Sequence, residues 1–229
     1  MANTNLELTP RKENTRDKIQ IIQFDLDDIL QHFNDNISNI KNQLTVADEL
    51  TKSNNTSAAE DIWRSQIVFL ESAFDFYMHE LTKCGLLKIF RGEWNKTEKY
   101  QNIQLKMSYL ERALDNNNDT WFLEFINTFY RDITMASFDS VKKQLNLLGI
   151  NIKQVADNAF YDENSKENTK DKLKRRLDEL FIRRNCIAHQ SDRSHADAVR
   201  KNISKEDTLN FIADIEKIVY GIDKHIRTK

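Results

Sequence analysis

The stretch IWRSQIVFLESAFDFYMHELTK, residues 62–83, decides the fold of this chain. Apolar side chains surround it on nearly every side, so we predict a helix at the centre of the molecule rather than on its surface. The polar residues Ser72, Asp75 and His79 stand out because their three- and four-residue steps place them on one face. A polar stripe on a buried helix needs partners, since unpaired polar groups destabilise a folded protein.

The composition around this stretch predicts an all-α protein. The 229 residues include only 4 Gly and 1 Pro, so helix breakers are few. The net charge of −2 argues against a protein that coats nucleic acid, and any RNA contact must be local. The two cysteines lie far apart and no apolar run reaches membrane-spanning length, so we expect a cytoplasmic protein without membrane contact.

The helical pattern extends over most of the chain. We expect residues 1–14 to be disordered and residues 15–229 to form one domain, with residues 15–50 as an N-terminal helical extension and residues 57–229 as the core. The extension carries an apolar stripe from Ile19 to Leu44. The stripe fits either packing against its own domain or the seam of a dimer.

A basic segment lies in the last third of the chain. Residues 166–184 contain eight Lys or Arg against four Asp or Glu. From this segment we select four candidate RNA-binding residues: Lys172, Arg175, Arg176 and Arg183. The alternative is a solvated helix face, which is the commoner meaning of such a run.

The basic segment leads directly into the run Arg184-Asn185-Cys186-Ile187-Ala188-His189. A histidine moves protons near neutral pH, and an arginine can bind a phosphate whose charge grows during RNA cleavage. A five-residue step leaves the two side chains about 140° apart on an unbroken helix. They converge only if the helix bends near Asn185 or a second subunit completes the site. Cys186 with His189, helped by His79 or His195, is too weak a pattern for a metal site, and we expect no metal.

Three segments in order resemble one known family. The Arg184-to-His189 run resembles the Arg-x4-6-His signature of HEPN domains. Residues 70–81, with Asp75 at an acidic position, resemble the early helix of the RiboL-PSP-type HEPN branch. Residues 136–150 resemble its middle segment. The resemblance covers about residues 63–218 and implies an all-α, HEPN-like helical bundle.

The resemblance also implies a function and a site. It implies a metal-independent endoribonuclease without a cofactor, acting in anti-phage defence or a toxin–antitoxin system, with Arg184 and His189 as the catalytic pair. Asn185 would support the local geometry, and Asp75 would orient the pair, with Ser72 and His79 in supporting positions. The expected partners are RNA, a second copy that forms a composite active site, and an antitoxin or defence protein.

Two other functions remain open. A non-catalytic HEPN-type module would bind RNA or a partner protein through the same surface. A helical assembly subunit would instead use the helix of residues 15–45.

Overall fold

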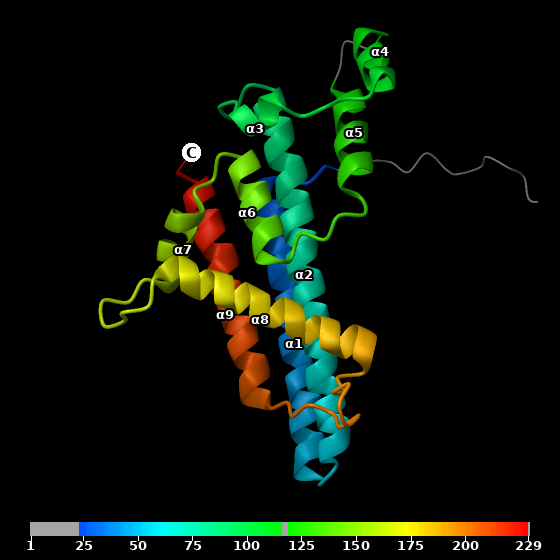
Figure 1. The fold of residues 1–229 in the computed structure, drawn as a ribbon, viewed down its shortest axis with the longest axis vertical. Coiled ribbons are helices and arrows are strands. Elements are labelled where there is room, and N and C mark those ends of the chain that lie inside the picture. Colours follow the sequence, from blue (N-terminus) through cyan, green and yellow to red (C-terminus); the bar gives the residue numbers. More distant parts are fainter. Residues whose placement is uncertain (1–22, 116–118, 229) are drawn as a thin grey trace, which may run out of the picture.

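The computed structural model describes residues 23–115 and 119–228, and in these ranges the chain forms nine helices and no strand (Figure 1). The all-α prediction is confirmed, whereas the disorder expected for residues 1–14 lies outside the described residues. None of the described helices is long and apolar enough to cross a bilayer. The helices are α1 (Leu26–Lys52), α2 (Thr56–Phe90), α3 (Glu98–Gln101), α4 (Met107–Asp115), α5 (Thr120–Tyr130), α6 (Phe138–Leu147), α7 (Ile152–Phe160), α8 (Thr169–Gln190) and α9 (Lys205–Ile226).

The predicted central helix is α2, and α1 packs along it as an antiparallel partner (Figure 1). Asp25 caps α1 and forms a capping box with Asp28, which fixes where the helix begins. The α1 stripe from Ile29 to Leu44 is buried in the same core as α2. Packing against its own domain therefore accounts for this stripe, and the part of the expected extension that the structure describes belongs to the core of the bundle.

Helices α5, α6, α8 and α9 also contact α2. Helix α8 crosses α2, and α9 runs beside α7 and α2 (Figure 1). Ser204 caps α9 with Asp207 in a capping box. Helices α7 and α9 approach so closely that a Cβ added at Gly221 would lie 2.9 Å from the Val155 carbonyl oxygen. Glycine is required there by space.

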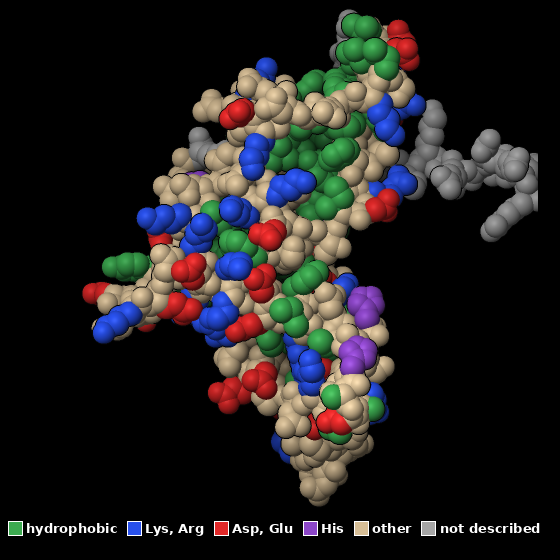
Figure 2. Space-filling view, in the orientation of Figure 1, with side chains coloured by type: hydrophobic (Ala, Val, Ile, Leu, Met, Phe, Trp, Pro, Cys, Tyr) green, Lys and Arg blue, Asp and Glu red, His purple; other side chains and the backbone are tan. Residues whose placement is uncertain are grey.

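Helices α4 and α5 leave apolar side chains exposed. Helix α4 packs against α5 and buries none of its residues. Figure 2 shows hydrophobic side chains gathered near this end of the molecule. The residues that we call the α4–α5 surface are Leu105, Met107, Leu110, Leu114, Phe129 and Ile133.

Candidate active site

The predicted Arg–His pair lies in the last two turns of α8. Asn168 caps this helix by accepting hydrogen bonds from the Lys170 and Asp171 backbone N–H groups. The helix runs unbroken to Gln190, so no bend at Asn185 brings the pair together. Arg184 is partly buried and His189 is exposed. On an unbroken helix the two side chains point about 140° apart.

Arg184 faces a buried carboxylate on α2. Its Nε lies 3.2 Å from Glu71 Oε2, and its NH1 donates a hydrogen bond of 3.0 Å to Asn185 Oδ1. Glu71 is only 2% exposed, and its other oxygen, Oε1, has no hydrogen-bond partner in the described part of the chain. The contact with Nε is an ion pair rather than an aligned hydrogen bond. Asn185 and Glu71 together fix where the guanidinium lies.

The electrostatic environment of Glu71 is unusual for a carboxylate. Burial raises the pKa of Glu71 above its ordinary value; the charge of Arg184 opposes this rise, and the charge of Asp75 adds to it. Arg184 therefore only partly compensates the desolvation of its partner. A buried carboxyl with a perturbed pKa beside an arginine is a frequent feature of functional sites.

Asp75 has a different role from the one predicted. Its Oδ1 accepts a hydrogen bond from the Met135 backbone N–H, and its Oδ2 lies 3.6 Å from His79 Nε2. The same His79 nitrogen is 2.7 Å from the Ile133 carbonyl oxygen. Both side chains thus hold the linker between α5 and α6. The expected contact of Asp75 with the pair is therefore corrected to Glu71, one turn earlier on α2.

The sequence contained a signal for Glu71 that the prediction missed. Glu71, Asp75 and His79 are spaced i, i+4 and i+8, so Glu71 lies one turn before Asp75 on the same face of α2. Ser72 does not join this contact network. It is exposed and lines a groove between α1 and α2.

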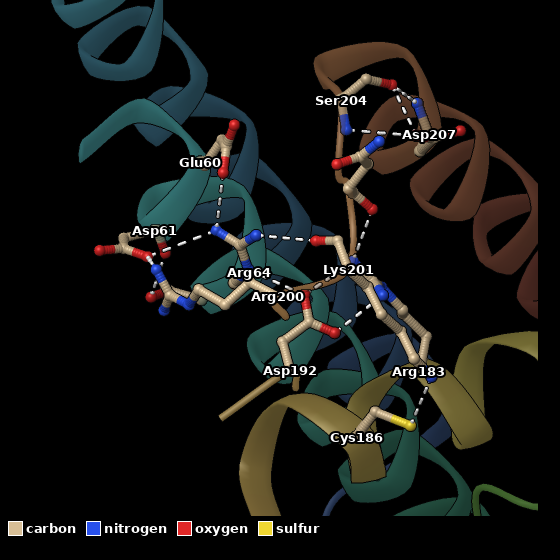
Figure 3. A network of polar contacts seen from close by, with 12 residues as sticks. Glu60, Asp61, Arg64, Arg183, Cys186, Asp192, Arg200, Lys201, Ser204 and Asp207 are labelled. Atoms are coloured by element: carbon tan, nitrogen blue, oxygen red, sulfur yellow. Dashed lines mark hydrogen bonds and ion pairs between the residues drawn. The ribbon is translucent and has the colours of Figure 1, made fainter. Parts of the chain in front are cut away.

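Arg183 belongs to an ion-pair network around the buried Asp192 (Figure 3). Asp192, at 0% exposure, lies between two arginines. Its Oδ2 accepts from Arg64 Nε and Arg183 NH2, both at 2.8 Å, and its Oδ1 lies 2.8 Å from Arg183 NH1. This network ties the loop after α8 to α2. The RNA-binding role of Arg183 stays a prediction; in the structure its guanidinium neutralises a buried carboxylate.

The other predicted RNA-binding residues also have protein partners. Arg175 pairs with Glu167 and Glu179, on the solvent-facing side of the helix. Arg176 Nε lies 2.9 Å from Asp214 of α9. The Lys172 ammonium lies 5.5 Å from the centre of the Phe160 ring. These contacts favour the solvated-face alternative for most of the basic run, because its charges are matched within the protein.

The geometry leaves two side chains of α8 for phosphate chemistry, Arg184 and His189. Arg184 is held by Glu71 and Asn185, and His189, five residues further along α8, is exposed to solvent. Within the described residues, no three His, Cys, Asp or Glu side chains are grouped so that they could hold a metal ion. The Cys186 thiol accepts a hydrogen bond of 3.3 Å from the Lys201 ammonium.

Comparison with known protein families identifies the family of this chain. The model of the family described as RiboL-PSP-HEPN matches residues 25–228. These residues run from the N-cap of α1 to beyond the end of α9 and include Glu71, Arg184 and His189. No curated protein matches the chain, and no solved structure does.

Proposed function

Because the chain belongs to the RiboL-PSP-HEPN family, whose members generally cleave or bind RNA, we propose that it is a metal-independent endoribonuclease. One observation carries the proposal. Arg184 and His189 lie on the same unbroken helix, α8. The buried Glu71 carboxylate of α2 positions Arg184, and His189 is exposed. We further propose, from the family resemblance, a role in anti-phage defence or a toxin–antitoxin system.

RNA supplies its own nucleophile for this reaction. The 2′-oxygen forms a bond to the adjacent phosphorus while the bond from phosphorus to the 5′-oxygen breaks. The 2′-OH proton passes to a base, and the leaving 5′-oxygen takes a proton from an acid. His189 can perform either transfer, and Arg184 stabilises the charge that grows on the phosphate oxygens. The products are a 2′,3′-cyclic phosphate and a 5′-hydroxyl.

A second copy of the chain completes the proposed site. One histidine cannot be base and acid in the same step, and on one α8 helix His189 points away from Arg184. In a homodimer whose α8 ends face one another, Arg184 of each copy would lie near His189 of the other. The cleft then holds two arginines and two histidines, so one histidine can act as the base and the other as the acid.

The direct test compares RNA cleavage by the wild type with Arg184→Ala and His189→Ala, in buffer containing EDTA. Each variant should lose at least about a hundredfold in rate, the size expected for an acid–base group or a charge-stabilising group. His195→Ala, an exposed histidine in the following loop, is the matched control and should cleave normally. A substrate with 2′-deoxyribose at the cleaved position should be inert. Cleavage that survives both substitutions would refute the proposal.

A protein-interaction module is the second candidate, and the α4–α5 surface favours it. Contiguous exposed apolar side chains often mark sites where partner proteins bind. An antitoxin or another defence protein would fit such a role. This candidate predicts no RNA product under any condition and a partner whose binding is lost on Leu110→Glu.

A further inference from the structure

A groove between α1 and α2 lies close to the proposed active site. It has a volume of about 390 Å³, within the range of sites for small ligands. The buried side chains of Ile40 and Ala73 form its base. Two aromatic side chains of α2 line it and remain exposed, Phe69 at 51% and Phe76 at 39%.

The polar lining of the groove consists of uncharged groups. Asn36, Asn39 and Gln43 line it from α1, and Ser72 lines it from α2. In the part of the chain that the structure describes, these four side chains make no hydrogen bond to another residue, so their donors and acceptors are free for a ligand. Amides offer a donor and an acceptor side by side, which matches the edge of a nucleobase.

The chemistry of the lining selects the ligand. A phosphate would require a cationic group, and none lines the groove. A purely apolar partner segment would leave the amides unpaired at a cost in free energy. An unpaired base fits both the aromatic and the amide side chains of the lining, since it stacks on an aromatic ring and forms hydrogen bonds at its edge.

The groove is also in the right place for a substrate of the proposed enzyme. Ser72 follows Glu71 directly, so the groove and the Arg184 contact lie at the same level of α2 on faces about 100° apart. A helix with its side chains is about 10 Å across. A short stretch of single-stranded RNA can span that distance.

We propose that the groove between Phe69 and Phe76 binds one unpaired base of the RNA substrate, close to the phosphate held by Arg184. This inference rests on the proposed function. The subsite gives the enzyme a contact with single-stranded RNA that needs few cations, in keeping with the ion pairs that engage Arg175, Arg176 and Arg183.

The test uses a full-length His189→Ala background, which prevents cleavage, and fluorescently labelled single-stranded RNA. Loss of stacking in the Phe69→Ala/Phe76→Ala variant should weaken affinity about tenfold or more. The matched control is Phe129→Ala, because that side chain is also 51% exposed but lies on α5. A series of oligonucleotides with one abasic position should show a single position where the missing base weakens binding. In the Phe69→Ala/Phe76→Ala variant, removing the base at that position of the RNA should not weaken binding further.

Each outcome separates the subsite from the activity. If the wild type cleaves RNA and the Phe69→Ala/Phe76→Ala variant binds as tightly as the Phe129→Ala control, the subsite is refuted and the proposed function stands. If the wild type neither binds nor cleaves RNA, the proposed function itself fails. If the double variant instead lowers the oligomeric mass in sedimentation, the groove is an interface between copies, and the base-binding inference is overturned.

Discussion

Replacing Asp192 with alanine removes the carboxylate that joins two arginines in the interior. Asp192 is fully buried and Arg64 is 3% exposed, so Arg64 cannot regain full hydration without local unfolding. Breaking a buried ion pair by removing one partner costs about 3–5 kcal/mol. Arg64 keeps contacts with Glu60 at 3.2 Å and the Lys201 carbonyl at 2.9 Å. We therefore expect a loss near the lower limit, about 3 kcal/mol.

This loss can be measured by urea unfolding followed by circular dichroism. For a domain of this size, about 3 kcal/mol corresponds to a fall in Tm of about 6–12 °C. Asp197→Ala is the control, because Asp197 lies in the same loop but is exposed, and it should cost less than about 1 kcal/mol. An Asp192→Ala protein that unfolds within about 1 kcal/mol of the wild type would refute the argument that this network fixes the end of α8.

Three further substitutions test separate features. Burial raises the pKa of Glu71, so ionisation of this carboxyl costs folded-state stability as the pH rises from the ordinary glutamate pKa through the raised value. The unfolding free energy of Glu71→Gln, measured against that of the wild type, should therefore increase over this window; a flat or falling difference would contradict it. Gly221→Ala should cost about 1–3 kcal/mol, because its Cβ would press on the Val155 carbonyl, and an unchanged Tm would show that α7 and α9 can separate freely. Leu114→Glu, at a side chain 78% exposed, should change the unfolding free energy by less than about 0.5 kcal/mol, and a larger loss would mean that α4 is packed in solution.

Most of the fold was predictable because local patterns determine it. The apolar surroundings of residues 62–83 identified the central helix, and the scarcity of Gly and Pro identified the all-α class. The sequence predicted a helical extension over residues 15–50 and left open whether its stripe packs against its own domain or forms a dimer seam, since a sequence cannot tell which surface covers an apolar stripe. The structure places the described part of this stripe against α2.

The candidate site was predictable only in part. The Arg184 and His189 motif was visible because both residues lie in one short segment. Glu71 and Asp75 are only one turn apart on α2, so the carboxylate that contacts Arg184 depends on where α8 crosses α2. The sequence does not show where that crossing lies. The partner of Arg64 was hidden for the same reason, because Asp192 lies 128 residues away in sequence.

The position of Asp192 restricts which residues can replace it. Ser191 and Asp192 both have positive φ angles, 50° and 59°, immediately after α8. Glycine would adopt this backbone without strain but would leave Arg64 and Arg183 without a counter-ion. Aspartate is among the few non-glycine residues that enter the left-handed region readily, and it also carries the required charge. A loop residue, ordinarily free to vary, is here constrained by backbone and by charge together, and natural variation at position 192 should be as narrow as in the core.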